Sequence, residues 1–444
     1  MEPLNGYNLY EASELAQDGT IYFLARRAGD GVKVLGVQGN TAGFAGTPHP
    51  GSDVLLCPLT PENAAALRQR LPWLAPAPLA LQTSAGFGDR LGLATPGHAQ
   101  SVMGTGIAPI FAQQSVRENA RTGRTPQEVV DDAMWGVFEV GWREPWGADA
   151  DHLKTPDVIA PFVEAGYSFF TIDPSEHVDN AAQTDDEMGL QQKVQALSWS
   201  AMETSLADLE ARFLGQTFNL GTLQLTFDRV TLLRAVAKYG RAVPHIAEMH
   251  RHVSMQMSGK PFDFEVSVDE TDTPTSIHEH FYIATELQRL GITWHSLAPR
   301  FVGRFEKGVD YIGDLDALDA NLAGHSAVMR HFGGYKLSLH SGSDKFTVYP
   351  LAARHAEGLV HLKTAGTSYL EALRVWAGVD PAAFRDVLDF SRGRYETDRA
   401  TYHVSAVLER VPEANAVPDA DLPDLLNRFD TRQVLHVTYG SVLD

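Results

Sequence analysis

A short segment of the chain, residues 336–345, carries several groups that can do chemistry. Its sequence is KLSLHSGSDK. Side chains alternate between the two faces of a strand, so the two leucines share one face while Lys336, Ser338 and His340 share the other. A turn follows, with two more hydroxyls, Ser341 and Ser343. Imidazoles bind metals or carry protons, and hydroxyls bind sugar oxygens. The pattern predicts a strand that delivers reactive groups at its carboxyl end.

The same design recurs in other parts of the chain. Residues 262–270 place Glu265, Ser267 and Asp269 on one face, and other polar residues follow this pattern: Asp173, His295, His361 and Lys363. A single polar residue at a strand end is more often structural than catalytic. Five strands that share the feature favour a common site, because buried polar groups need partners. The simplest partners are each other, a metal ion and a polar substrate.

The segment GADADHLK, residues 147–154, is the second strong signal. Asp151 and His152 are neighbours, so they can reach one site only if the strand has ended. The small residues before them allow a ligand to approach closely. This composition suits a metal ligand beside a general base. An acidic surface loop with a lysine counter-charge is the alternative.

Three histidines, His152, His295 and His340, are predicted at the carboxyl ends of strands. Imidazoles with a carboxylate suit Zn, Mn, Co, Ni or Fe and leave positions open for substrate oxygens. Glu265 or Asp173 could complete such a shell. Histidines that only hydrogen-bond within the fold are the alternative. The remaining candidates are predicted to be mainly solvent-exposed: His245, His250, His252, His278 and His280.

Cationic side chains gather near the same strand ends: Arg300, Arg304, Lys307, Lys345 and Lys363. They suggest local capture of a carboxylate or a phosphate. A phosphate site usually has a glycine-rich loop at the start of a helix, and no such loop is found here. The sequence therefore favours a carboxylate at least as much as a phosphate. Lys363 also raises the possibility of Schiff-base chemistry. The three histidines favour the metal route.

The overall composition and net charge exclude some classes of binding partner. The 444 residues carry 36 basic and 56 acidic side chains, a formal net charge of −20. Such a chain has no electrostatic footprint for nucleic acid or an anionic membrane. No apolar run approaches a membrane span, and no basic, apolar leader begins the sequence. The single cysteine, Cys57, excludes an intrachain disulfide framework. We expect a cytoplasmic protein.

The order of predicted elements indicates the fold. Residues 1–82 form an accessory region with a hairpin and one helix. The rest, 83–444, alternates strands with helices, which implies parallel strands and a (β/α)8 barrel with its site at the strands' carboxyl ends. A long helical insert is expected around 174–259. An open doubly wound sheet is the alternative. The eight predicted strands are 89–94, 107–113, 146–152, 168–173, 262–269, 292–297, 336–340 and 359–364.

Several long motifs resemble the tagaturonate/fructuronate epimerase family of bacterial hexuronate catabolism. They are GADADHLKT, FTIDPSEHVDN, FEVSVDET, WHSLAPRFVGRFEKGVDYIGD, KLSLHSGSDKF, HLKTAGTSYLEALR and LHVTYGSVL, in the family order. The resemblance implies a divalent-metal-dependent enzyme that interconverts D-tagaturonate and D-fructuronate. It also implies Asp151 as proton acceptor, Glu265 as donor, and His152, His295 and His340 as ligands. The substrate would contact Asp173, Arg300, Ser341, Ser343, Lys345 and Lys363.

Two other functions fit the same residues. A metal-dependent aldolase or sugar isomerase would share the metal and the base but give other products. A sugar-acid binding protein would need no acid and base beside a metal. The C4 proton of the substrate is not acidified by the C2 ketone, so a retro-aldol route is expected for the epimerase. The sequence leaves the oligomeric state open.

Overall fold

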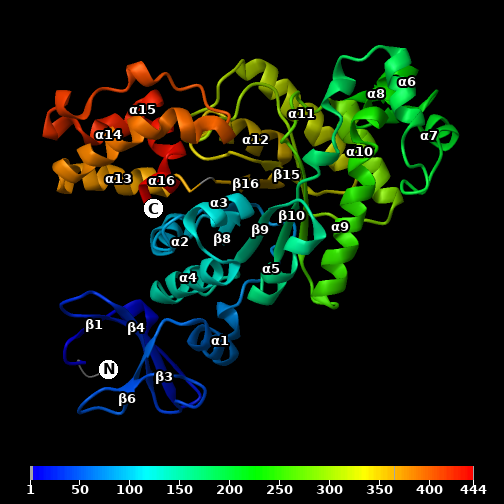
Figure 1. The fold of residues 1–444 in the computed structure, drawn as a ribbon. Helices are drawn as coiled ribbons and strands as arrows, with labels where there is room; N and C mark the ends of the chain where they lie inside the picture. The colour runs from blue at the N-terminus through cyan, green and yellow to red at the C-terminus, as the bar shows by residue number, and fades with distance from the viewer. Residues whose placement is uncertain (1–3, 365, 444) are drawn as a thin grey trace.

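Eight parallel strands close into a barrel in the computed structural model, which describes residues 4–364 and 366–443 (Figure 1). In chain order they are β7 (Ser84–Gly86), β8 (Ala108–Ser115), β9 (Gly147–Leu153), β10 (Phe169–Ile172), β13 (Asp263–Val268), β14 (Ser296–Pro299), β15 (Lys336–Leu339) and β16 (Val360–Lys363). Strand β16 pairs with β7, which closes the ring and excludes the open sheet. The predicted barrel is confirmed.

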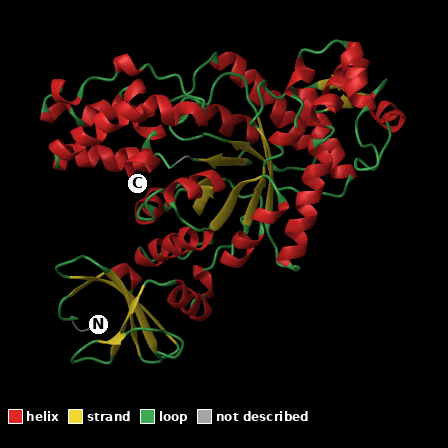
Figure 2. Ribbon diagram, viewed as in Figure 1, coloured by secondary structure: helices red, strands yellow, loops and turns green. Residues whose placement is uncertain are grey.

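Helices follow the strands and cover the outside of the barrel (Figure 2). They are α2 (Thr95–Val102), α3 (Val116–Thr122), α4 (Pro126–Glu139), α5 (Ala160–Ala165), α9 (Ala242–Met257), α10 (Ile277–Arg289), α11 (Leu315–His331) and α12 (Tyr349–Ala356). A capping box opens α4, where the Thr125 side chain accepts from the Glu128 amide and the Glu128 side chain accepts from the Thr125 amide. The apolar strand faces, such as Phe264, Val266 and Leu337, join one buried cluster with these helices. The polar faces therefore point into the barrel.

The N-terminal region is an antiparallel sheet followed by a helix. Its strands are β1 (Tyr7–Leu9), β2 (Leu15–Gln17), β3 (Thr20–Arg27), β4 (Lys33–Gln38), β5 (Thr47–Pro48) and β6 (Val54–Pro58), and the helix is α1 (Pro61–Arg70). The predicted hairpin is β3–β4. Leu35 and Leu67 belong to the same buried cluster as Phe138 of α4. The division at residue 82 therefore stays a prediction, because this region and the barrel share a core.

Two further helical regions extend the barrel. The insert after β10 holds α6 (Glu187–Gln195), α7 (Leu206–Phe213), the hairpin β11 (Thr217–Asn219) and β12 (Gln224–Thr226), and α8 (Arg229–Tyr239). The segment after β16 holds α13 (Ser368–Val379), α14 (Pro381–Asp398), α15 (Phe429–Val437) and α16 (Tyr439–Leu443), orange to red in Figure 1. We call this second segment the C-terminal extension; its presence was not predicted. None of the helices described has the length and apolar character to span a membrane.

Two predicted strands are wrong in position. Residues 89–94 form a turn, because the Asp89 carboxylate accepts from the backbone amides of Leu91, Gly92 and Ala94. The first strand is instead Ser-Ala-Gly, which has no apolar alternation to reveal it. Strand β14 starts only at Ser296, because the Ile292 amide still closes the end of α10 by donating to a helix carbonyl. This shift matters for the site.

A buried pair of histidines lies behind the barrel wall. His280 and His325 are fully buried, and their Nδ1 atoms lie 2.9 Å apart. The Tyr335 hydroxyl contacts His280 Nε2 at 2.7 Å. The expectation that His280 lies on an exposed helix face is therefore wrong. His245 is also buried and stacks on His177, with ring centroids 4.0 Å apart.

We expect acid to destabilise the fold through His325. Burial lowers its pKa to about 3, whereas an unfolded imidazole has a pKa of about 6.5. Because the folded pKa is the lower one, this contribution is present above pH ~6.5 and is lost as the pH falls. At pH ~5.5 the loss is about 1.4 kcal/mol.

Urea denaturation of His325→Gln should reveal this loss. The variant keeps a hydrogen-bonding group without the titration, so unfolding free energies at pH ~7.5 and ~5.5 should differ by about 1.4 kcal/mol less than in the wild type. His331→Gln, on an exposed position of the same helix, is the control. An unchanged pH difference in His325→Gln would contradict the assignment of a neutral imidazole.

Candidate active site

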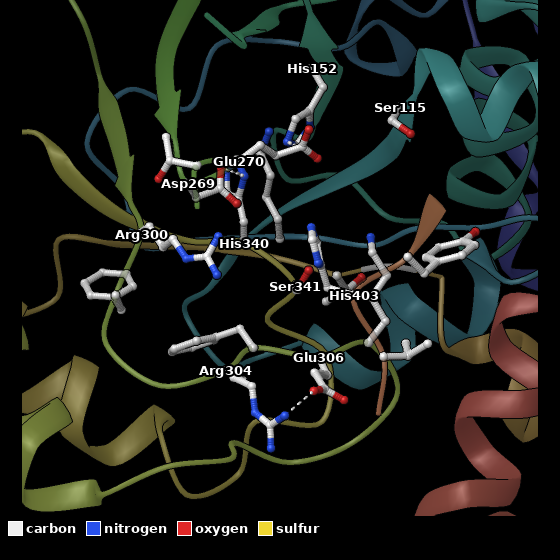
Figure 3. A pocket seen from close by; sticks show the side chains of 18 of the residues that line it. Ser115, His152, Asp269, Glu270, Arg300, Arg304, Glu306, His340, Ser341 and His403 are labelled. Atoms are coloured by element: carbon white, nitrogen blue, oxygen red, sulfur yellow. Dashed lines mark ion pairs between the residues drawn. The ribbon is translucent and has the colours of Figure 1, made fainter. Parts of the chain in front are cut away.

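A cavity of about 500 Å³ opens at the carboxyl ends of the strands. Its floor comes from β8, β9, β13, β15 and β16 and the turns that follow them. Its roof comes from the C-terminal extension, which contributes Tyr402, His403, Val404 and Ser405. The loop after β14 forms another wall, with Arg300, Arg304 and Glu306 labelled in Figure 3. The cavity therefore lies at the predicted end of the barrel, although the roof was not predicted.

Two imidazoles and a carboxylate converge at one side of this cavity. His152, Asp269 and His340 each offer a ligand atom, and these atoms all lie within 4.8 Å of one another. The two imidazole rings have centroids 5.0 Å apart. Figure 3 shows the three side chains grouped together. We call them the triad.

The backbone explains how neighbouring residues reach one site. His152 has a φ of +58°, in the left-handed region. The register between β9 and β10 also shifts there, since Phe170 pairs with Ala150 but Ile172 pairs with Leu153. This irregularity turns His152 back toward Asp151, with His152 Nδ1 2.7 Å from Asp151 Oδ1. The regular alternation that would have separated the two side chains is therefore broken.

Each imidazole of the triad has a carboxylate on one ring nitrogen. Asp151 contacts Nδ1 of His152, and Glu265 Oε1 lies 2.8 Å from Nε2 of His340. The other nitrogen of His340, Nδ1, lies 3.0 Å from Asp269. This pattern leaves one nitrogen of each ring for a metal, and a carboxylate on the second nitrogen sets tautomer and orientation.

The donor set fits a divalent cation of the predicted kind. Two imidazoles with one carboxylate suit Zn, Mn, Co, Ni or Fe. Burial would lower the pKa of His340, but Asp269 and Glu265 raise it to about 9. Burial would also lower the pKa of His152, but the Asp151 carboxylate outweighs this effect and raises the pKa to about 10. Without a metal these imidazoles are cations balanced by carboxylates, and a metal ion would replace that positive charge.

Lys363 lies under the cavity at the centre of an ion cluster. Its Nζ is 2.8 Å from Asp149 Oδ2, 2.6 Å from Asp151 Oδ1 and 3.0 Å from Glu265 Oε1. Burial would lower the pKa of Lys363, but these carboxylates raise it well above its usual value. A Schiff base needs a neutral amine, so this environment opposes the Schiff-base chemistry at Lys363 that the sequence left open.

The same cluster keeps Asp151 ionised. Burial would raise the pKa of Asp151, but His152 and Lys363 hold it well below its usual range. Burial also raises the pKa of Asp149, to about 7, against the opposing charge of Lys363. Asp151 lines the cavity and Asp149 does not. Asp151 is therefore the ionised carboxylate of this cluster that can meet a ligand.

His295 does not join the site. It precedes β14, so it lies at the amino end of that strand, where its Nδ1 accepts from the Phe264 amide at 3.1 Å. Its Nε2 is 3.8 Å from Asp263 Oδ1. The premise that His295 ends a strand is wrong, and a ligand role beside His152 and His340 is wrong with it. Asp269, and not His295, is the third group that converges with His152 and His340.

The predicted substrate contacts divide into two groups. Arg300, Ser341 and Lys363 line the cavity, whereas Asp173, Ser343 and Lys345 do not. Lys345 Nζ donates to the carbonyls of Glu306, Val309 and Ser343 at 2.7, 2.5 and 2.9 Å. The Asp173 carboxylate accepts from the Ser175 amide at 2.9 Å. In this structure these two side chains support loops and do not reach the cavity.

Glu265 does not lie where a proton donor in direct contact with the substrate would have to lie. It is fully buried beneath the triad and does not line the cavity. Besides His340 and Lys363, it accepts from the Ser296 hydroxyl at 2.6 Å. As a proton donor it would have to act through His340. Asp151, Asp269 and Glu270 are the carboxyl groups near the triad that do line the cavity.

Some residues that line the cavity were not predicted as site residues from the sequence. Asp269 shares a strand face with Glu265, and this alternation could have identified it. Arg117 and Glu118 begin α3, directly after β8, which ends in glutamines and a serine. Their place after a strand was a usable signal. Tyr402 and His403 lie far along the chain in the C-terminal extension, and no local pattern points to them.

Comparison with known proteins supplies independent information. A family model described as tagaturonate epimerase matches residues 10–444. The tagaturonate/fructuronate epimerase of Thermotoga maritima is 42% identical over 443 residues, covering 99% of this chain and 90% of that protein. A glycerol-complexed crystal structure of the fructuronate-tagaturonate epimerase of Cohnella laeviribosi has a TM-score of 0.93 and 39% identity, covering 98% of this chain and 88% of that one. Its native structure also has a TM-score of 0.93, with 38% identity over 99% and 88% of the two chains.

Proposed function

Because this chain belongs to the tagaturonate epimerase family, we propose that it interconverts D-tagaturonate and D-fructuronate in a divalent-metal-dependent reaction. An epimerase is an isomerase, and the family places the chain in that class of enzyme. The observation that carries the proposal is the triad beside an ionised Asp151 in one cavity.

The chemistry of the substrate favours cleavage of a carbon–carbon bond. The two ketouronates differ in configuration at C4, and the ketone is at C2 when the sugar is numbered as a ketose. The hydrogen on C4 is too far from the ketone to be acidified by it. The hydroxyl on C4 is instead placed for a retro-aldol reaction, in which the C3–C4 bond breaks. The products would be a three-carbon enediolate and a three-carbon aldehyde acid.

Asp151 is the proposed base for this step. It removes the proton of the C4 hydroxyl, the C4–O bond becomes a carbonyl, and the electrons of the C3–C4 bond move to the C2 oxygen. The aldehyde then turns about its C4–C5 bond and presents its other face. C3 attacks again, and the new C4 alkoxide recovers the proton from Asp151. The step balances without an oxidant, and one carboxylate serves both directions.

His152, Asp269 and His340 are the residues that would hold the metal. A divalent cation bound there supplies Lewis-acid polarisation of the substrate's carbonyl and adjacent hydroxyl oxygens. Asp151 and Glu265 orient the two imidazoles, and the Lys363 ammonium balances the negative charge of these two carboxylates. Arg300 and Ser341 line the cavity and can bind substrate oxygens. A donor role for Glu265 stays a prediction that requires transfer through His340.

Incubation of the enzyme with D-tagaturonate in deuterated water tests both function and mechanism. We expect NMR to show D-fructuronate whose C4 still carries protium, because the retro-aldol route never breaks the C4–H bond. Deuterium at C4 would contradict this route in favour of a carbanion. Absence of D-fructuronate would contradict the function, and net release of three-carbon fragments would identify an aldolase instead. Buffer with substrate but no enzyme is the control.

A further inference from the structure

Lys307 differs from the other lysines that are buried near the barrel. It lines the cavity from the loop after β14 and is half-buried. Within residues 4–364 and 366–443, no hydrogen-bond acceptor satisfies its ammonium group and no carboxylate oxygen lies within 4.0 Å of it. Lys363 has three carboxylates and Lys345 has three carbonyls. Lys307 is thus a cation that still needs a partner.

Two arginines, Arg117 and Arg90, repel the ammonium group of Lys307, while two carboxylates, Glu118 and Asp151, attract it. Burial lowers the pKa of Lys307, Glu118 and Asp151 oppose this, and Arg117 and Arg90 add to it. Glu118 does not neutralise the group alone, because Arg90 also contacts it at 3.5 Å. Arg90 is itself fixed over the Tyr439 ring, 3.5 Å from the centroid. An anion that entered this part of the cavity would relieve the repulsion among these cations.

The C-terminal extension holds the backbone on both sides of Lys307. The Glu306 carboxylate accepts from the Ser405 amide and from the Gln433 side chain, both at 2.9 Å. On the other side, the Gly308 carbonyl accepts from Arg432 Nε at 2.6 Å. Lys345 Nζ additionally donates to the Glu306 carbonyl at 2.7 Å. The backbone that carries Lys307 is therefore held in place, so that little backbone freedom is lost when Lys307 binds a ligand.

We propose that Lys307 binds the carboxylate of the substrate and so makes the cavity select sugar acids over neutral ketoses. This inference rests on the proposed function. Among the described Lys and Arg residues that line the cavity, Arg300 also lacks a side-chain partner, but it lies beside Asp269 and His340, where the ketone end would be (Figure 3). Lys307 instead lies within electrostatic reach of Asp151, the base at C4.

This placement also suits the proposed mechanism. The carboxylate is separated from C4 by one carbon, so an anchored carboxylate still allows rotation about the C4–C5 bond. The aldehyde fragment would stay bound while it exposes its second face. The C-terminal extension would then serve the reaction by holding Lys307 in place. An ammonium is a compact point charge, which leaves the carboxylate free to turn more than a bidentate guanidinium would.

Steady-state kinetics of Lys307→Met test the proposal. We expect kcat/KM for D-tagaturonate to fall roughly 10- to 100-fold, as for loss of a charge-assisted hydrogen bond, mainly through a higher KM. Inhibition by D-tagatose, which has a hydroxymethyl group in place of the carboxylate, should stay within about 3-fold of wild type. Lys307→Arg should recover part of the lost kcat/KM, because it keeps the charge.

Other outcomes are equally decisive. An unchanged KM in Lys307→Met, or an equal loss of D-tagaturonate and D-tagatose binding, would overturn the carboxylate role. Lys260→Met, at an exposed lysine, is the matched control, and circular dichroism verifies that each variant is folded. If wild-type enzyme gave no D-fructuronate, the proposed function would fail first. If wild type is active and only the variant result differs, the inference about Lys307 alone fails.

Discussion

Asp151→Asn should lower kcat for D-tagaturonate by about 10²- to 10⁴-fold, the usual contribution of a general base. The asparagine oxygen can still accept hydrogen bonds from His152 and from Lys363, which lie 2.7 and 2.6 Å from Asp151 Oδ1. The geometry around the triad should therefore persist while the basic group is lost. The measurement is kcat from D-fructuronate formation, together with substrate affinity by calorimetry.

Two further readouts separate a base from a positioning group. Metal content by mass spectrometry should stay near that of wild type in Asp151→Asn, and substrate affinity should change by less than about 10-fold. Loss of metal would show that Asp151 acts mainly by orienting His152, and a retained kcat would exclude it as the base. Asp157→Asn, at an exposed position four residues after the histidine's neighbour Leu153, serves as the control.

Removal of the divalent metal should reduce turnover by about 1,000-fold or more, since Lewis-acid catalysis provides several kcal/mol. Dialysis against a chelator, followed by separate addition of Zn, Mn, Co, Ni or Fe, would measure this loss and identify the ions that restore activity. His340→Ala should bind no stoichiometric metal, because it removes one nitrogen of the triad. Asp269→Ala should also lower the amount of bound metal, because it removes the carboxylate of the triad.

His295→Ala is the matched control for that experiment. It removes an imidazole from the same barrel, but at the amino end of β14 and outside the cavity. We expect this variant to keep its metal. Full turnover after complete removal of metal would contradict the proposed chemistry, and metal loss in His295→Ala with retention in His340→Ala would contradict the triad.

The fold and the end of the barrel that carries the site were accessible from local sequence. Alternation in residues 336–340 and 262–269 separates an apolar face from a polar one, and this survives in the structure because helices cover the apolar faces. Strand–helix order then implies parallel strands and a site at their carboxyl ends. The exception was β7, whose three small residues have no alternation to detect.

The ends of the strands were harder to predict from the sequence, and they decide which side chains reach the site. A strand and the turn before it can share the same alternation, so residues 292–297 look continuous although β14 starts at Ser296. This difference moves His295 to the opposite end of the barrel. Conversely, His152 reaches the triad only through a left-handed φ and a register shift. Such irregularities depend on pairing between strands and not on residue type alone.

The sequence by itself determined that polar residues such as His152, His340 and Asp151 gather at the mouth of a barrel, because alternation and element order are local properties. Only the tertiary structure decided that Asp269 completes the triad, that Glu265 supports His340 from below, and that the C-terminal extension covers the cavity and holds Lys307. These facts depend on closure of the ring and on contacts between segments remote in sequence. Short-range periodicity carries no information about either.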